Sequence, residues 1–204
     1  MAWAHAPWHV EIVAEDTNAP HWTSSPERVP RWQMSALVAL AVATLALASQ
    51  IAIPIGPVPI SAQTLIVFWL GASLKVWVSG LSVTLWLGLG ALGWPVFAES
   101  TGGHEVLLGP SGGYLFAFLP AVVGLGSLAR RRVFDSFWAA ALAHTAATGM
   151  VQMCGATWLA LSIGAADAWR HGVAPFLPGA LVKVMVGAAL VRPIRSALHA
   201  FGER

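Results

Sequence analysis

Long apolar stretches with few charges are the feature that most constrains the fold of this chain. They lie at residues 34–53, 61–74, 76–94, 113–129, 137–163 and 175–191. A helix needs about 20 residues to cross a bilayer. Most of these stretches approach that length, although the second is short. Charged residues make up only 10% of the chain, whereas soluble domains carry roughly 25%. The sequence therefore predicts an all-α integral membrane protein with six transmembrane helices.

The first 31 residues differ from the rest of the chain in composition. They hold scattered proline and serine and four acidic residues, Glu11, Glu15, Asp16 and Glu27. They lack the basic start and the apolar core of a signal peptide. We expect residues 1–31 to form a disordered cytoplasmic tail, followed by a membrane domain over residues 32–204.

Lysine and arginine are distributed unevenly around the apolar stretches. With a cytoplasmic N-terminus, nine basic residues fall on the cytoplasmic side, whereas only Arg170 falls outside and Lys183 lies within the sixth stretch. The nine are Arg28, Arg31, Lys75, Arg130, Arg131, Arg132, Arg192, Arg195 and Arg204. Positive residues stay on the cytoplasmic side of membrane proteins, so both termini are predicted to be cytoplasmic. Topology explains these charges, and the bilayer rather than a nucleic acid is their expected partner.

Three segments on the predicted outer face are rich in glycine and proline. They span residues 51–60, 88–114 and 171–183, and the first contains Pro54, Pro57 and Pro59. Such backbone is tolerated at membrane depth only when it is buried in protein or lines a cavity. A tight turn between two helices is the alternative for the first segment. The convergence of three such segments favours a pocket that opens to the outside, with the loops at 51–60 and 99–112 closing it.

Lys183 is the sharpest indication of a binding site. A lysine at the centre of a membrane helix costs about 3 kcal/mol, and such a residue is by default a functional candidate. It lies about 12 Å from either end of its predicted helix, which is long for a lysine that snorkels to the membrane surface. Residues one turn away carry no acid. Its negative partner is then either Glu99, from a distant part of the sequence, or the ligand itself.

Other candidates are weaker. Gln63 and Tyr114 are placed to face the same cavity, but they are equally compatible with satisfied helix-end residues. An aromatic wall is possible from Trp86, Trp94, Phe97, Trp158 and Phe176, although membrane-interface or core positions are the alternative. His104 and His144 lack further ligands at a metal spacing, so no metal is predicted. No nucleophile with its base is recognisable, and no lysine follows a glycine as a phosphate-binding loop requires.

Four stretches of the chain resemble the signature stretches of the BioY family. They are SQIAIPIGPVPISAQTL (49–65), GALGWPVFAES (90–100), GPSGGYLFAF (109–118) and GVAPFLPGALVK (172–183). This family is the biotin-binding component of energy-coupling factor transporters. The resemblance implies an outward biotin site in a six-helix bundle of the bacterial cell membrane, with biotin as transported ligand and no cofactor. It also implies association with a transmembrane coupling subunit and two ATPases.

The resemblance further implies that the first helix docks on the coupling subunit through small residues spaced by four. Ala39 and Ala43 fit that pattern, and small residues let helices approach closely. Three positions depart from the family pattern. Ala180 stands where an acid is expected one turn before Lys183, and Trp86 and Gln152 stand where tyrosines are expected.

The residues predicted to bind substrate are Gln63, Trp86, Phe97, Glu99, Gly113, Tyr114, Gln152, Phe176 and Lys183. Biotin uptake is the favoured function. One alternative is a diverged binder for another small anionic or ureido-type solute, suggested by Ala180, Trp86 and Gln152. The other, more remote, is a membrane-embedded enzyme with His104 or His144 as base.

Overall fold

The computed structural model describes residues 31–54 and 56–202. Its main helices are α1 (Arg31–Gln50), α2 (Gln63–Ser73), α3 (Val76–Ala91), α5 (Gly112–Ala129), α6 (Phe137–Ile163) and α8 (Phe176–Gly202). Short elements connect them: strands β1 (Ala52–Ile53) and β2 (Ile60–Ser61), helices η2 (Ala98–Ser100), α4 (His104–Leu108), η3 (Val133–Asp135) and α7 (Ala165–Ala168), and the π-helical turn η4 (Trp169–Val173). The predicted tail lies outside the described residues, apart from Arg31.

The helices follow the predicted apolar stretches, with differences at their ends. α6 has the predicted bounds, whereas α1 ends at Gln50 because the chain then enters an antiparallel β1–β2 ladder. α8 continues to Gly202, past residue 191 and through Pro193. Within the described residues, four helices, α1, α5, α6 and α8, are long and apolar enough to cross a membrane, whereas α2 and α3 are shorter apolar helices. The protein is therefore a largely helical bundle with several segments able to span a bilayer.

α5 lies at the centre of the bundle and packs against α2, α3 and α6. Small residues let the helices approach closely. A Cβ atom at Gly71 of α2 would lie 2.9 Å from the carbonyl oxygen of Val122 of α5, and one at Gly126 would lie 2.9 Å from the Val76 side chain. Such contacts are typical of membrane helices, whose association depends on close packing.

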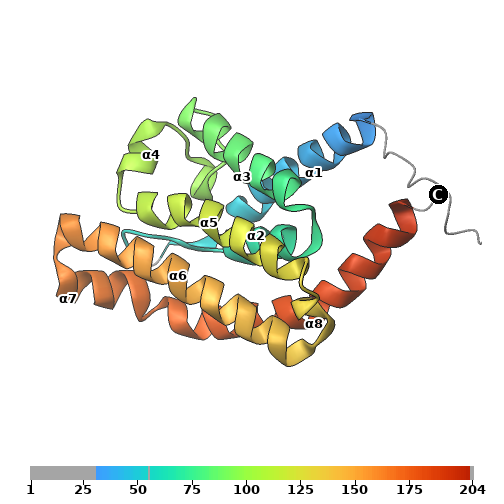
Figure 1. Ribbon diagram of the computed structural model, residues 1–204. Coiled ribbons are helices and arrows are strands. Elements are labelled where there is room, and N and C mark those ends of the chain that lie inside the picture. Colours follow the sequence, from blue (N-terminus) through green and yellow to red (C-terminus); the bar gives the residue numbers. More distant parts are fainter. Residues whose placement is uncertain (1–30, 55, 203–204) are drawn as a thin grey trace, which may run out of the picture.

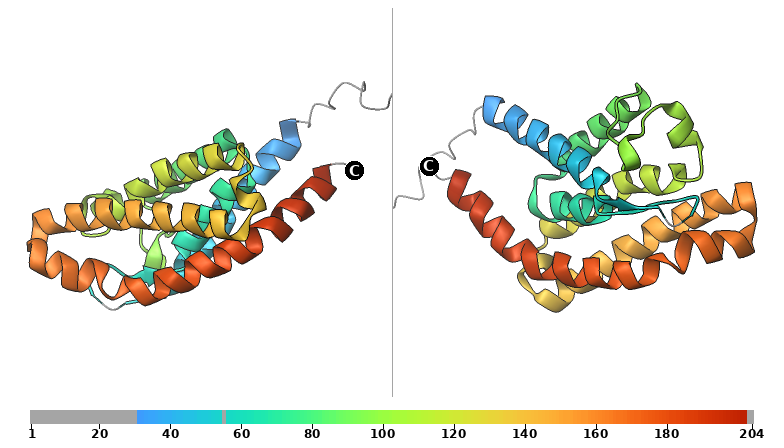
Figure 2. Two further views of the ribbon diagram at one scale, coloured as in Figure 1. Left: turned by 60° about the horizontal axis from the view of Figure 1, so that its bottom comes forward. Right: turned by 180° about the vertical axis from the view of Figure 1, so that it is seen from behind.

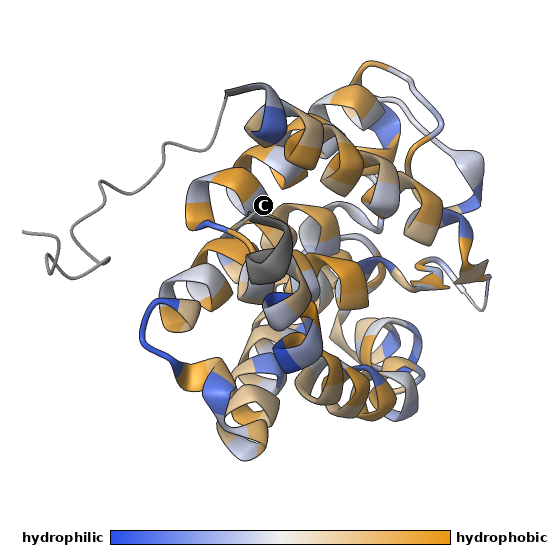
Figure 3. Ribbon diagram, turned by 90° about the vertical axis from the view of Figure 1, so that its right-hand side faces the viewer, coloured by the Kyte–Doolittle hydropathy of each residue, from blue (hydrophilic) through white to orange (hydrophobic). Residues whose placement is uncertain are grey.

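The arrangement of the elements separates two ends of the molecule. The start of α1 and the described end of α8 lie at the same end, and α4 and α7 lie at the opposite end (Figures 1 and 2). α6 and α8 run side by side and are joined through α7 and η4 (Figure 1). Hydrophobic residues predominate along the helices, and hydrophilic ones gather at turns and helix ends (Figure 3). The loops predicted to be outer segments thus meet at the end that holds α4 and α7.

The close approach of α2 and α5 can be tested with Gly71→Leu. We expect this change to lower the stability of the folded protein by about 1–3 kcal/mol, because overpacking forces the helices apart. Gly124→Leu is the matched control, since a Cβ atom at helical Gly124 has no neighbour within 4 Å. Thermal denaturation in detergent measures both. Equal midpoints for the two variants would show that the α2–α5 contact is not tight.

Candidate functional site

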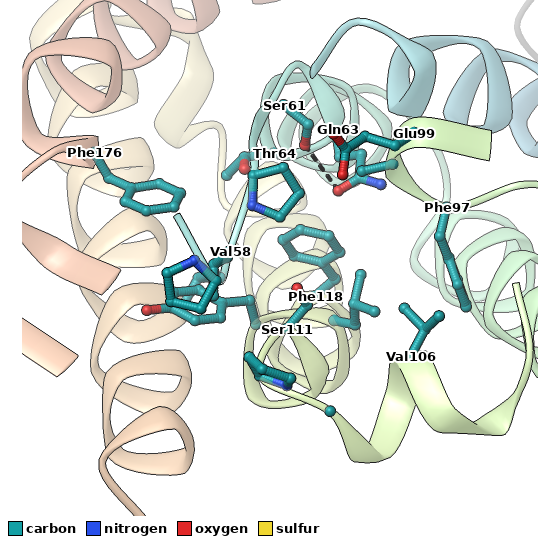
Figure 4. A pocket seen from close by; sticks show the side chains of 18 of the residues that line it. Val58, Ser61, Gln63, Thr64, Phe97, Glu99, Val106, Ser111, Phe118 and Phe176 are labelled. Atoms are coloured by element: carbon teal, nitrogen blue, oxygen red, sulfur yellow. Dashed lines mark hydrogen bonds between the residues drawn. The ribbon is translucent and has the colours of Figure 1, made fainter. Parts of the chain in front are cut away.

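A cavity of about 270 Å³ lies where the three segments predicted to be on the outer face meet. Pro57, Val58 and Pro59 line it from the β1–β2 connection. Residues from β2, α2, the segment 97–111, α5, α6 and α8 form the remaining walls (Figure 4). The volume is near the lower end of small-molecule sites, about 300–1,000 Å³. The predicted convergence of the three segments is therefore confirmed. The proline-rich segment is both a turn and a wall of this cavity.

Of the nine predicted substrate-binding residues, all within the described part of the chain, seven line this cavity. They are Gln63, Phe97, Glu99, Tyr114, Gln152, Phe176 and Lys183. Phe97 and Phe176 lie on opposite sides of it (Figure 4). Residues from five separate regions of the sequence thus share one site.

Trp86 and Gly113 do not line the cavity. The Trp86 ring is fully buried behind Phe97, with the two rings edge to face at 5.1 Å, and its Nε1 donates to the carbonyl oxygen of Val96 at 3.0 Å. Gly113 instead provides close packing, because a Cβ atom there would lie 2.3 Å from the Cβ of Trp158. Both residues support the wall from behind.

Lys183 extends from α8 into the cavity and donates a hydrogen bond to the carbonyl oxygen of Ser61. The predicted ion pair with Glu99 is not formed. Among the described residues the ion pairs are His104–Glu105 and Arg170–Asp167, both exposed. The amine is therefore held by the β1–β2 hairpin rather than by a carboxylate. An ammonium group has three donors, so two remain for a ligand.

Gln63 connects three elements at the floor of the site. Its Oε1 accepts a hydrogen bond from Ser61 Oγ at 2.8 Å, as Figure 4 shows, and its Nε2 donates to Ser49 Oγ of α1 at 2.9 Å. Ser49 Oγ in turn donates to the carbonyl oxygen of Leu45 at 2.7 Å. The Gln63 side chain is buried, so this network fixes the hairpin against α1 and α2. One N–H and one lone pair of the amide remain available.

Tyr114 joins α5 to the π-helical turn. Its hydroxyl donates to the carbonyl oxygen of Gly172 at 2.8 Å, and its ring stacks on Phe176 at a centroid distance of 5.9 Å. Gly155 of α6 makes room for the ring, because a Cβ atom there would lie 2.2 Å from Tyr114 Cδ1. The stacked pair forms an aromatic surface on one side of the cavity.

Gln152 and Ala180 lie where the lining differs in polarity from the family pattern. Gln152 Nε2 is shielded from solvent and has no hydrogen-bond partner among the described residues, and Ala180 also lines the cavity. An unpaired buried amide nitrogen is costly, which suits a donor reserved for a ligand.

Sequence reasoning missed Thr148, which lines the cavity one helical turn before Gln152. Residues at i and i+4 share one face of a helix, and that spacing was the available signal. Ser111 and Glu105 also line the cavity, and no sequence pattern singles them out.

The histidines of the enzyme hypothesis lie away from this site. His144 is fully buried between Phe68 and Phe134, and its Nδ1 is 2.7 Å from the carbonyl oxygen of Ala140. The His104 side chain is exposed beside Glu105. Neither histidine lines the cavity.

Comparison with known proteins identifies the family. The sequence profile of the BioY family matches residues 22–200. The chain belongs to the BioY family. It is 35% identical to the probable biotin transporter BioY of Pyrococcus horikoshii over 159 residues, which cover 78% of this chain and 94% of that protein. It is 34% identical to the biotin transporter BioY of Thermotoga maritima over 149 residues, 72% of this chain and 87% of that protein.

The fold comparison agrees with this assignment. The structure is similar to the S-component for biotin from an ECF-type ABC transporter, with a TM-score of 0.73 and 27% sequence identity over 81% of this chain and 92% of that chain. The relatives are named as transporters and not as enzymes. The chain is therefore a member of a transporter family, and the enzyme hypothesis is wrong.

The hydrogen bond from Tyr114 to Gly172 is expected to contribute to the stability of the folded protein. We expect Tyr114→Phe to destabilise the protein by about 0.5–1.5 kcal/mol, because one hydrogen bond is lost while the stacking on Phe176 is kept. Thr145→Val is the control, since the Thr145 hydroxyl bonds only the carbonyl oxygen of Ala141 in its own helix. Thermal denaturation of both variants measures the difference. A midpoint for Tyr114→Phe equal to that of the control contradicts the role assigned to the hydroxyl.

Proposed function

We propose that this protein is the biotin-binding component of an energy-coupling factor transporter for biotin uptake. The observation that carries the proposal is the Lys183 amine inside an otherwise largely apolar cavity of a BioY-family chain. Small-molecule sites typically combine apolar walls with a few placed polar groups. Lys183 has no carboxylate partner among the described residues, which leaves its charge available to a ligand.

Biotin matches the groups that line the cavity. Its ureido ring offers a carbonyl acceptor and two N–H donors, its thioether ring is apolar, and its side chain ends in a carboxylate. Lys183 and the unpaired Nε2 of Gln152 are donors for the carbonyl or the carboxylate. Phe97, Tyr114 and Phe176 supply apolar surface. Glu99 and Glu105 are the two acids that line the cavity, and either is an acceptor for the ureido N–H groups when position 180 is alanine.

A second candidate is a BioY-like binder of another small anionic or ureido-type solute. Ala180 favours it, because this residue lines the cavity without the acid expected there. Gln152 lines the cavity as well, and its amide offers a ligand other donors and acceptors than the tyrosine expected at this position. Titration with biotin and with related vitamins distinguishes the two candidates.

The membrane topology that we propose has six spans with both termini in the cytoplasm of a bacterial cell. α2 has only 11 residues, about 17 Å of helix, so it reaches only part of the way through the hydrocarbon core. The β1–β2 hairpin occupies the remaining depth, where irregular backbone is tolerated because it lines a cavity. Arg130, Arg131 and Arg132 lie in the α5–α6 connection, toward the end of the molecule that also holds the start of α1 and the described end of α8 (Figure 1). That common end is the proposed cytoplasmic side.

The partners that we propose are a transmembrane coupling subunit and two ATPases. Ala39 and Ala43 are exposed on α1 and border a wide groove between α1 and α3. Small exposed residues at this spacing allow a partner helix to approach closely. This face of α1 is separate from the cavity, to which no residue of α1 contributes lining.

The role of Lys183 predicts a defined loss of affinity. We expect Lys183→Met, which keeps the apolar stem, to weaken biotin binding by about 1.5–3 kcal/mol, the value of a hydrogen bond to a charged group. That is more than about tenfold in Kd. Lys75→Met is the matched control, because Lys75 is exposed between α2 and α3. Isothermal titration of the purified protein with biotin measures both.

Biotin binding to Lys183→Met as tight as to the parent would remove Lys183 from the ligand contacts. Ala180→Asp separates the two candidates for the ligand. Tighter biotin binding by this variant indicates that an acceptor is missing in a biotin site. Weaker binding favours a site arranged for another solute.

The topology predicts which thiols an impermeant reagent can reach from outside intact cells. In a Cys154→Ser background, the thiol from Asp167→Cys should react and that from Ser196→Cys should not. Both positions are exposed in the structure, so burial does not explain a difference. The reverse pattern would place the cavity mouth on the cytoplasmic side.

A further inference from the structure

Gln50 ends α1 and reaches across to the segment 97–101. Its Oε1 accepts hydrogen bonds from the backbone nitrogen and the Oγ of Ser100, both at 2.9 Å. Its Nε2 donates to the carbonyl oxygen of Phe97 at 3.2 Å and to that of Ala46 at 3.0 Å. A side-chain amide has two N–H donors and two acceptor lone pairs, so all four are used. Three of the four bonds hold the segment 97–101.

The backbone of this segment is strained. Glu99 has φ 58° and ψ 32°, and Ser100 has φ 56°. Left-handed conformations cost residues with side chains about 1–3 kcal/mol each and persist only where the surroundings enforce them. Two consecutive residues of this kind therefore need an external restraint. The bonds from Gln50 supply one, because they end on Phe97, two residues before Glu99, and on Ser100, the second strained residue.

The restrained segment forms part of the cavity wall. Phe97, Ala98, Glu99 and Thr101 all line the cavity. Within the segment, the Phe97 nitrogen donates to the Thr101 carbonyl oxygen at 3.0 Å, and Thr101 Oγ1 donates to the Ala98 carbonyl oxygen at 2.8 Å. The segment is thus a compact unit that is tied to α1 through one side chain. Gln50 itself does not line the cavity.

We propose that Gln50 is a positioning residue that holds the segment 97–101 in place as a wall of the cavity and thereby sets the rate at which ligand leaves. Without its bonds the strained backbone at Glu99 and Ser100 relaxes, and Phe97 and Glu99 leave their places in the wall. The part of this proposal that concerns ligand release rests on the proposed binding of biotin. The part that concerns the wall does not.

The first measurement uses no ligand. Ala98 is 9% exposed, so a thiol introduced by Ala98→Cys in the full chain with Cys154→Ser is shielded while the wall is in place. Adding Gln50→Met, which keeps the side-chain length and removes all four bonds, should speed its reaction with a maleimide by about tenfold or more. Gln33→Met is the matched control, because Gln33 is an exposed glutamine near the other end of α1.

A second thiol distinguishes local opening from general loosening. Ala147 is 7% exposed in α6 and does not line the cavity. The thiol from Ala147→Cys should react at the same rate with and without Gln50→Met. Equal acceleration at both positions would make Gln50 a general stability residue and overturn the proposal. The proposal would also be overturned if the thiol from Ala98→Cys reacted at the same rate with and without Gln50→Met.

The third measurement is the dissociation rate of biotin from chains without the added thiols. Gln50→Met should raise this rate by a factor similar to that in labelling, whereas Gln33→Met should leave it unchanged. Faster labelling with unchanged dissociation would overturn the assignment of ligand release to Gln50. If the parent protein does not bind biotin, the proposed function fails, and the labelling alone decides whether Gln50 positions the wall.

Discussion

The structure depends on pairing the polar backbone groups of segments that are not helical. In a bilayer an unpaired carbonyl or amide cannot turn to water, yet part of the cavity wall of this protein is irregular chain. Long side chains from the helices donate hydrogen bonds to carbonyls of the hairpin, of the segment 96–109 and of the π-helical turn. The pairs are Gln50 with Phe97, Trp86 with Val96, Tyr114 with Gly172, Trp158 with Gly109, and Lys183 with Ser61. Each bond fixes one part of the wall to a different helix.

This construction explains why the cavity is small and largely apolar. The Tyr114 hydroxyl and one donor of Lys183 are bonded to the backbone, so they present less polar surface to the interior. The aromatic rings of Phe97 and Phe176 supply apolar surface from opposite sides of the cavity (Figure 4). Glycines at close helix contacts let α5 and α6 bring these supports within reach. Close packing of membrane helices and the pairing of loop backbone therefore define the site together.

Local pattern predicted the helices and the loops that surround the site, because hydropathy and Pro/Gly content are properties of neighbouring residues. It predicts Lys183, Tyr114 and Gln63 at one cavity, and all three line the cavity of the structure. Trp86 lies behind Phe97 and outside the lining, and nothing in a sequence tells which of these two places a ring occupies. The resemblance indicates the family. The Gln50 bonds and the conformation of Glu99 depend on contacts between residues about 50 positions apart, so no local sequence pattern predicts them.

Lys183 shows how one residue serves the fold and the site together. Its bond to the Ser61 carbonyl joins α8 to the hairpin, so the amine is held within the protein and does not snorkel. A carbonyl dipole stabilises a positive charge without neutralising it, and the acids that line the cavity, Glu99 and Glu105, are themselves exposed. An ammonium group in this place has one donor on the Ser61 carbonyl and two further donors. An acceptor that enters the cavity meets a donor whose position is already fixed, which lowers the entropy lost on binding.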